Sequence, residues 1–401
     1  MSINKGLIAL AFGGLAIGMT EFTMMGILPD IAADIEIDIP TASNLIGLYA
    51  LGVVVGAPTL VAATSKYPAK KVLLFLMLLF FVFNAIFTFA PNHWSLFASR
   101  FISGLPHGAF FGIGSVVAAK LANPGKEAQA ISMMFTGMTI ANLAGVPLGT
   151  YIGHHYSWRF TYGAISLLGL ITFLAIYFWM PVIPANKNNN VVQQISYFKR
   201  WDAWLMVAVI AIGTGGLFAW ISYISKLVTT VSGLSPDQVS TVMILIGAGM
   251  LVGNLIGGRL ADRISPSKAA ITSFAAMACC LLILFFVAHI TALAYPMAFI
   301  TGMIAFSIGS PLQMMLINNA KGAETFAAAG GQASFNIGNS LGAYFGAIPI
   351  AYGFAYNYPS LIGVAMAATG AVLAYIFLQK VEKKQNQKGR KFESLEELEQ
   401  A

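Results

Sequence analysis

Long apolar segments separated by short polar segments make up most of the chain, and this pattern predicts a bundle of membrane helices. About 20 apolar residues are needed to cross the roughly 30 Å hydrocarbon layer of a bilayer. Each run must be helical because lipid offers the backbone no hydrogen-bond partners, and the alternation typical of a barrel strand is absent. The sequence therefore predicts an all-α polytopic membrane protein with twelve transmembrane helices. The predicted spans are residues 7–28, 42–64, 71–90, 95–120, 128–152, 160–181, 203–227, 238–261, 268–288, 291–317, 326–351 and 357–379.

The basic residues predict how these spans are oriented, because Lys and Arg concentrate in the cytoplasmic loops of membrane proteins. With the N-terminus in the cytoplasm, 19 of the 22 Lys and Arg residues fall in cytoplasmic segments, and only Arg100, Arg159 and Lys226 do not. Both termini are therefore expected on the cytoplasmic side.

The longest internal connection, residues 182–202, divides the spans six and six. We expect an N-terminal half at 1–181, a cytoplasmic linker at 182–202, a C-terminal half at 203–379 and a charged tail at 380–401. The two halves look duplicated. A constant shift of 197 residues aligns Gly18 with Gly215, Gly52 with Gly249, Gly56 with Gly253, Lys71 with Lys268, Asn142 with Asn339, Gly145 with Gly342 and Gly149 with Gly346. Repeats of six helices are typical of secondary transporters that bind their substrate between the halves.

Composition excludes other classes of protein. The chain is 58% hydrophobic and 9% charged, whereas an ordinary soluble domain is about 25% charged. The net charge of +7 does not indicate nucleic-acid binding, because the basic residues lie in short loops and a tail rather than on one face. Cys279 and Cys280 are neighbours in an apolar run and are expected to be small buried residues. No cofactor and no metal site are predicted.

Two places carry a full charge away from the predicted membrane surfaces: Glu21, and Arg100 in RFISGLPHGAFFGIG. A charge at such depth costs a few kcal/mol or more, so we interpret both as functional. At ~1.5 Å per residue both lie roughly 8–10 Å from the outer surface, so they share a depth. His107 is seven residues from Arg100, on the same helix face and nearer the midplane. Snorkelling of Arg100, a structural hydrogen-bonding role for Glu21 and simple packing of His107 remain the alternatives.

The loop after the eighth span, GGRLADRISPSK, resembles the signature loop of the major facilitator superfamily. Gly258, Asp262, Arg263 and Lys268 match that motif, together with Leu260. We expect Asp262 to accept hydrogen bonds from backbone N–H groups at a neighbouring helix start, in contacts that break as the cytoplasmic side opens. In the first half the related loop, VAATSKYPAKK, departs from the motif. Ser65 stands where the family has Asp, which puts a first-half latch in doubt.

The fourth and fifth spans carry two further resemblances. The stretch beginning at Arg100 is similar to the second motif of the superfamily, which implies a role for this Arg in proton transfer. Gly145, Pro147 and Gly149 resemble the antiporter motif of drug:proton antiporters, imperfectly, since Val146 and Thr150 replace two of its glycines. The further candidates for the wall of a substrate cavity are the polar side chains His107, Asn142, Gln313, Gln332, Asn336 and Asn339.

The segments GMTEF, YALGVVVGAP, SGLPHGAFFG and GMTIANLAGVPLGTY resemble the arabinose-efflux-permease-like branch of the drug:proton antiporters. The resemblance implies a monomeric, proton-coupled exporter of a sugar, nucleoside or drug-like molecule in a bacterial inner membrane. Its proton-coupling residues would be Glu21 and Arg100. Proton-coupled uptake or facilitated diffusion is the alternative within transport, and a non-transporting membrane sensor is a further alternative. A membrane enzyme is disfavoured, because the pair His154 and His155 has no acidic neighbour in the sequence.

Overall fold

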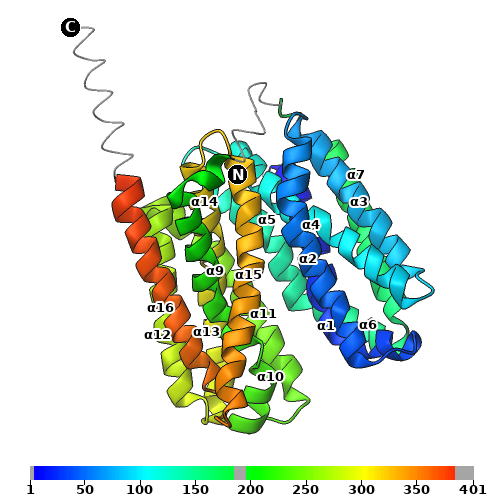
Figure 1. Ribbon diagram of the computed structural model, residues 1–401, viewed down its shortest axis with the longest axis vertical. Helices are drawn as coiled ribbons and strands as arrows, with labels where there is room; N and C mark the ends of the chain where they lie inside the picture. Colours follow the sequence, from blue (N-terminus) through cyan, green and yellow to red (C-terminus); the bar gives the residue numbers. More distant parts are fainter. Residues whose placement is uncertain (1–3, 185–195, 384–401) are drawn as a thin grey trace.

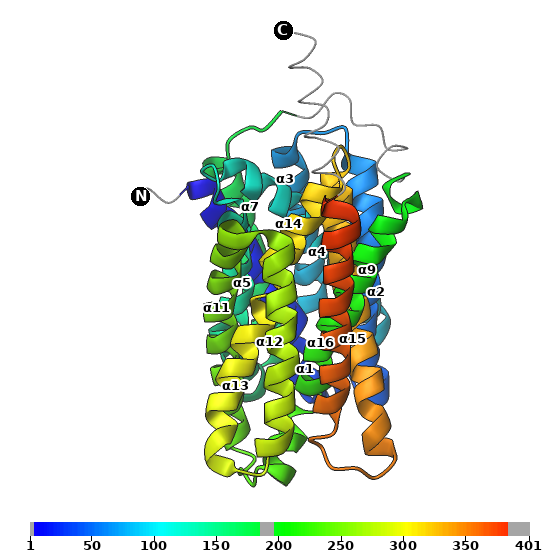
Figure 2. The ribbon, with the colours of Figure 1, turned by 90° about the vertical axis from the view of Figure 1, so that its left-hand side faces the viewer.

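The computed structural model describes residues 4–184 and 196–383, and these residues form long helices that run in roughly one direction (Figures 1 and 2). The helices of the first half are α1 (Lys5–Asp34), α2 (Ile39–Thr64), α3 (Ala69–Thr88), α4 (His93–Leu121), α5 (Glu127–Ile140), η1 (Ala141–Gly145), α6 (Val146–His155) and α7 (Trp158–Trp179). Those that follow are η2 (Tyr197–Lys199), α9 (Trp201–Ile221), α10 (Ile224–Lys226), η3 (Leu227–Val231), α11 (Gln238–Ile264), α12 (Pro266–Val287), α13 (Thr291–Phe306), α14 (Gly309–Asn319), α15 (Glu324–Ala351), α16 (Pro359–Phe377) and η4 (Leu378–Glu382).

Each of the twelve predicted apolar runs lies in a helical segment. Eleven segments of the described chain are long and apolar enough to cross a membrane. The remaining predicted span, 326–351, is α15, a helix of 28 residues whose Gly, Gln, Asn and Ser residues lower its hydropathy. The prediction of an all-helical polytopic fold is confirmed.

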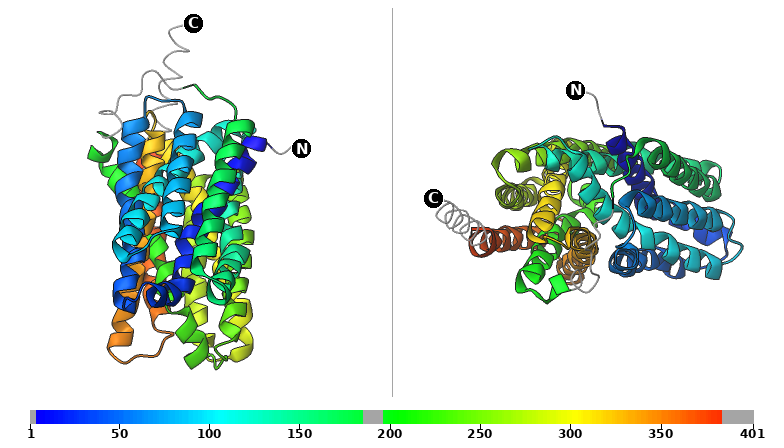
Figure 3. Two further views of the ribbon diagram at one scale, coloured as in Figure 1. Left: turned by 90° about the vertical axis from the view of Figure 1, so that its right-hand side faces the viewer. Right: turned by 90° about the horizontal axis from the view of Figure 1, so that it is seen from above.

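The buried apolar side chains fall into two clusters, one drawn mainly from α1–α7 and the other from η2 to η4. Seen from above, the helices from blue to teal form one group, and those from light green to red form another beside it (Figure 3, right). Helix α1 begins and η4 ends at the same end of the molecule, the upper end in Figure 1. The predicted linker at 182–202 lies partly, and the predicted tail at 380–401 mostly, outside the described residues.

Helix packing repeats between the two groups at positions related by the shift of 197 residues. A Cβ atom on Gly56 of α2 would lie 2.2 Å from the carbonyl oxygen of Leu105 in α4. A Cβ atom on Gly253 of α11 would lie 1.7 Å from the carbonyl oxygen of Met303 in α13. In both places the backbones approach too closely for any side chain, which is the packing that membrane helices achieve through glycine.

Two of the spans are irregular near their middle. The fifth changes from α-helix to the π-helical segment η1 just before Pro147, and the tenth breaks at Ser307–Ile308, just before Pro311. Proline has no N–H group and cannot complete the helical hydrogen bond to the residue four positions earlier. Each irregularity thus lies beside a proline, although Pro106 lies inside the unbroken helix α4, and both lie next to the interface between the groups.

Candidate functional site

A cavity lies between the two groups of helices, near the middle of the spans. It measures about 870 Å³, including the part that is open to solvent. Its wall is formed by Glu21, His107, Phe135, Met138, Ile210, Gly213, Thr214, Leu217, Asn254, Met277, Ala305, Phe306, Ile308, Gly309, Leu312, Gln313, Leu316, Gly331, Gln332, Phe335 and Asn336. Only four of these residues belong to the first half, so α9, α11, α13, α14 and α15 supply most of the surface.

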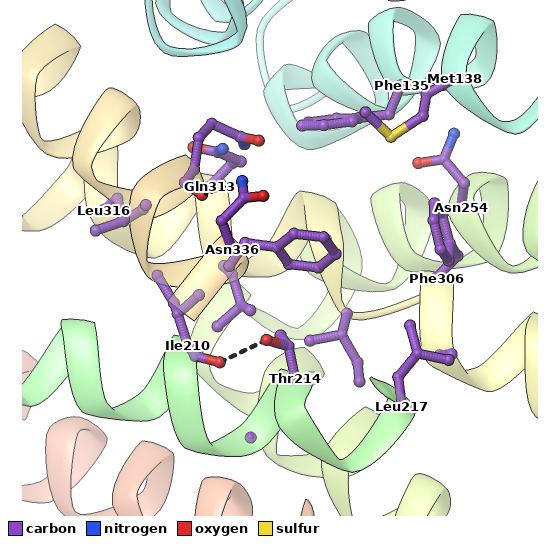
Figure 4. A pocket seen from close by; sticks show the side chains of 18 of the residues that line it. Phe135, Met138, Ile210, Thr214, Leu217, Asn254, Phe306, Gln313, Leu316 and Asn336 are labelled. Carbon is purple, nitrogen blue, oxygen red and sulfur yellow. Dashed lines mark hydrogen bonds between the residues drawn. The ribbon is translucent and has the colours of Figure 1, made fainter. Parts of the chain in front are cut away.

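The wall is largely apolar, with a few polar groups. Three of the predicted carboxamides line it and are buried, Gln313, Gln332 and Asn336. Figure 4 shows Gln313 and Asn336 projecting from the second half, with Phe135 and Met138 on a helix across the cavity. Such a wall suits a small molecule with apolar surface and a few hydrogen-bonding groups.

Glu21 lies in the cavity wall, and Arg100 lies behind it, with 1% of its side chain exposed. Arg100 does not form an ion pair with Glu21 within 4 Å. Instead its guanidinium donates hydrogen bonds to the carbonyl oxygen of Thr20, at 2.8 Å, and to the Thr20 hydroxyl, at 3.0 Å. The structure thus places the cation against the residue next to Glu21, where it acts on the carboxylate through the electric field rather than by contact.

Aromatic rings and further polar groups surround Arg100. Its guanidinium lies 4.2 Å from the centre of the Tyr49 ring and 5.6 Å from that of Tyr162, close enough for cation–π attraction. The Thr20 hydroxyl donates to Asn84 at 2.9 Å, and the Tyr162 hydroxyl donates to the Thr20 carbonyl at 3.3 Å. These groups hold the cation without a carboxylate in contact, and it does not snorkel to the surface.

His107 is the central residue of α4, and 2% of its side chain is exposed. Its Nδ1 atom lies 3.2 Å from the Tyr49 hydroxyl, and its ring packs against Phe111. Tyr49 therefore contacts both Arg100 and His107 and connects them.

Asn142 and Asn339, a matched pair in the sequence, are not part of the cavity wall. Asn142 lies in η1, where its side chain donates to the Met138 carbonyl oxygen at 3.2 Å. The glycines of the predicted antiporter motif pack on α1: a Cβ atom on Gly145 would lie 2.8 Å from Met19, and one on Gly149 would lie 2.9 Å from Thr23. The motif, with Pro147, thus contacts α1 on both sides of Glu21.

At the upper end, the last turn of α11 bonds to the start of α5. The sequence predicted a loop from Gly257 to Lys268, but α11 continues as helix to Ile264 and α12 begins at Pro266, so Asp262 lies inside α11. The Asp262 carboxylate accepts hydrogen bonds from the backbone N–H groups of Ala128, at 2.9 Å, and Gln129, at 3.0 Å. Gly258 lies directly below, where a Cβ atom would be 2.7 Å from Ser132. Arg263 and Lys268 are exposed and form no salt bridge with another described residue. Asp262 makes the kind of contact that its position in the motif suggests.

Deeper in the same interface, Asn254 and Ser132 bond to each other across the halves. The Asn254 side chain donates to the Ser132 carbonyl oxygen at 2.7 Å, and the Ser132 hydroxyl donates to the Asn254 carbonyl oxygen at 2.7 Å. The hydrogen bonds of Asp262 and Asn254 therefore close the upper part of the α5–α11 interface in this structure. This closed part reaches down to the cavity, because Asn254 is also one of the residues that line it.

In the first half, the position related to Asp262 is Ser65, which has no carboxylate. Ser65, Lys120 and Thr325 line a separate pocket at the upper end, where the first-half loop faces the start of α15. Thr325 is the counterpart of Ala128 under the shift of 197 residues. A hydroxyl thus stands here where the other half places a carboxylate.

Several residues of this region were missed by sequence reasoning: Thr20, Tyr49, Asn84, Ser132, Tyr162 and Asn254. Thr20 and Tyr49 belong to segments that carry the family resemblance, GMTEF and YALGVVVGAP, so a signal for them was present. The others are isolated polar residues in apolar helices. At the C-terminal end of α1, Asp30 lies 2.7 Å from His154, an acidic partner that is distant in the sequence. The described residues contain no group of three His, Cys, Asp or Glu side chains suited to a metal ion.

Comparison with known proteins gives a consistent result. Residues 10–331 match the family described as Major Facilitator Superfamily. The chain is 40% identical to the putative transporter AraJ of Escherichia coli K12, over 93% of this chain and 95% of AraJ. It is 27% identical to a chloramphenicol resistance protein of Streptomyces lividans, over 83% of this chain and 86% of that protein. Among solved structures, the E. coli fucose:proton symporter FucP superposes with a TM-score of 0.75 at 14% identity, covering 92% of this chain and 98% of FucP.

Proposed function

Because the chain belongs to the Major Facilitator Superfamily, and is therefore a membrane transporter and not an enzyme, we propose that it exports a small molecule in exchange for protons. The similar proteins whose names state a function include a chloramphenicol resistance protein and probable sugar efflux transporters. They agree with the drug:proton antiporter branch predicted from the sequence. For this chain, proton coupling, export and the bacterial inner membrane as its location remain the proposal.

The observation that carries the proposal is the position of Glu21. This carboxyl group is part of the wall of the central cavity. The preceding residue, Thr20, accepts a hydrogen bond from the buried Arg100. An ionised carboxylate in a largely apolar cavity wall is costly unless water or a cation compensates it, whereas the protonated form is not. Protonation of Glu21 and occupancy of the cavity by substrate therefore influence each other within one site.

Exchange follows if the two halves rock about this cavity. While the upper α5–α11 contacts are closed, the cavity exchanges substrate and protons with one side of the membrane. Opening requires the bonds of Asp262 and Asn254 to α5 to break. Substrate leaves toward one side, and Glu21 releases its proton toward the other.

Liposomes that contain the purified protein and a pH-sensitive dye test the proposal. Chloramphenicol added to one side should drive proton movement in the wild type, and Glu21→Gln should reduce it to the level of protein-free liposomes. Asp30→Asn, which removes a carboxylate from the end of the same helix, is the matched control and should keep the wild-type rate. Proton movement at the wild-type rate in Glu21→Gln would contradict the proposed role. Transport of the probe without any proton movement would favour facilitated diffusion.

A further inference from the structure

The break between α13 and α14 forms part of the cavity wall. Phe306, Ile308, Gly309, Leu312 and Gln313 all line the cavity, so both sides of the interruption at Ser307–Ile308 face it. Irregular backbone in a membrane is tolerated where it is buried in protein or lines a cavity. The break therefore belongs to the cavity's architecture.

Gly309 leaves a hollow in this wall. A Cβ atom on Gly309 would meet no atom within 4 Å, and the residue is exposed. Its counterpart under the shift of 197 residues is Gly112 in α4, where a Cβ atom would lie 2.6 Å from that of Ala329. Gly112 thus allows a helix of the other half to approach. Gly309 has no such neighbour, so helix packing does not explain the glycine.

Gln313 stands one helical turn further along. Its side chain is 4% exposed, and its Oε1 atom has no hydrogen-bond partner. In Figure 4 it projects toward the cavity beside Asn336, whose own amide donates to the Gln332 carbonyl oxygen at 3.0 Å. A buried acceptor without a partner is unfavourable, so a ligand that donates to it gains affinity.

We propose that Gly309 and Gln313 form the specificity-determining wall for the transported molecule. Gln313 accepts a hydrogen bond from an N–H or O–H group of the substrate, and the hollow over Gly309 receives an adjoining apolar group. The substrate is thus an amphipathic small molecule, with a donor group beside an apolar ring or chain, rather than a molecule with hydroxyl groups on every side. This inference rests on the proposed transport function.

The first test asks whether Gly309 faces the cavity. Cys279 and Cys280 are replaced by alanine, and Gly309→Cys is introduced. A charged methanethiosulfonate reagent reacts only with a thiol that water reaches. We expect the cysteine at 309 to react, and chloramphenicol, which carries hydroxyl groups beside a nitrophenyl ring, to slow the reaction. A cysteine that does not react, or reacts equally fast with the probe present, contradicts the proposal.

The second test measures export of chloramphenicol and of arabinose from cells. Gln313→Leu keeps the approximate shape of the side chain and should lower chloramphenicol export about tenfold, the effect of losing one hydrogen bond to a buried acceptor. Gly309→Val fills the hollow and should lower chloramphenicol export more than Gly309→Ala does. Gly309 does not have a positive φ angle, so neither substitution strains the backbone.

Gly47→Val is the matched control, because a Cβ atom on Gly47 also meets no atom within 4 Å and Gly47 is not part of the cavity wall. It should leave export unchanged. Wild-type chloramphenicol export in both Gln313→Leu and Gly309→Val would overturn the proposal, and so would arabinose as the better substrate. If the wild-type protein exports neither probe, the proposed export function is contradicted instead. The reaction of the cysteine at position 309 with the methanethiosulfonate reagent then decides whether the proposed wall faces the cavity.

Discussion

Inside the membrane, the two halves of the duplicated chain differ in charge. The first half places Glu21 in the cavity wall and Arg100 behind it. Under the shift of 197 residues their counterparts are Phe218 and Met297, and no charged residue among the described residues of the second half lines the cavity. The second half contributes carboxamides and apolar side chains. The comparison suggests a division in which the first half carries the protons and the second half contacts most of the substrate.

At the upper end, the difference is reversed. The second half has a carboxylate near the end of α11, Asp262, that accepts two hydrogen bonds from the start of α5. The first-half loop has Ser65 at the related position, near Thr325 at the start of α15. One carboxylate latch therefore closes this end where a symmetric duplication would provide two.

The largest effect should come from deleting the buried cation. Arg100→Ala leaves a cavity and removes the hydrogen bonds to Thr20, and we expect it to lower the free energy of unfolding by about 3 kcal/mol. Denaturant unfolding in detergent measures this loss. Arg159→Ala, at the partly exposed start of α7, should cost less than about 1 kcal/mol.

Arg100→Met copies the residue of the second half and sharpens the comparison. A hydrophobic replacement of similar length keeps the packing, and the Thr20 carbonyl oxygen keeps its bond from Tyr162. We expect stability within about 1 kcal/mol of the wild type, together with loss of proton-coupled export. If Arg100→Met unfolds the protein, the cation is structural and the division between the halves fails.

Asp262→Ala should have the next largest effect, on conformation rather than on folding. It removes two charge-assisted hydrogen bonds at a helix N-terminus, and we expect it to favour opening of the upper end by about 2 kcal/mol, or about 30-fold. Spin labels at positions 123 and 259, with Cys279 and Cys280 replaced by alanine, report the distance between α5 and α11 at this end. An unchanged distance distribution would show that Asp262 is not a latch.

The smallest effect is expected from Ser65→Asp, which restores the missing carboxylate. The new side chain would lie near the start of α15 and accept hydrogen bonds from the N–H groups there, as Asp262 does on α5. We expect it to stabilise the closed upper end by about 1 kcal/mol and to slow transport. Ser65→Asn, of the same shape and without charge, is the control. Equal transport rates in the two variants would exclude a charge-dependent latch.

Much of the fold could be predicted from the sequence because the bilayer imposes a simple rule. A run of about 20 apolar residues must be a helix, and all twelve runs are helical. The family could also be predicted, from Gly258, Asp262, Arg263 and Lys268 in one loop and from the segments around Glu21 and Arg100. The contact of Asp262 with a helix start agrees with the expectation from the motif, although the residues Gly257–Asp262 form the end of helix α11 rather than a turn.

The cavity wall was less predictable, because the rotation of each helix about its axis is set by its neighbours. Gln313, Gln332 and Asn336 line the cavity and the matched pair Asn142 and Asn339 does not, although all are amides in apolar spans. The hydrogen bonds of Arg100 to Thr20 rather than an ion pair with Glu21, and the ring of Tyr49 beside it, also required the packed helices.

The sequence by itself determined that this chain is a helical membrane transporter built from two related halves, because hydropathy, loop charge and short motifs are local properties that survive any rotation of the helices. Only the tertiary structure decided which polar side chains meet. It placed Glu21 and four carboxamides around one cavity, left Gly309 facing open space where Gly112 packs against Ala329, and formed one carboxylate latch where the duplication offers two. Such contacts join residues that are distant in the chain, and they depend on helix rotation and packing that no single segment encodes.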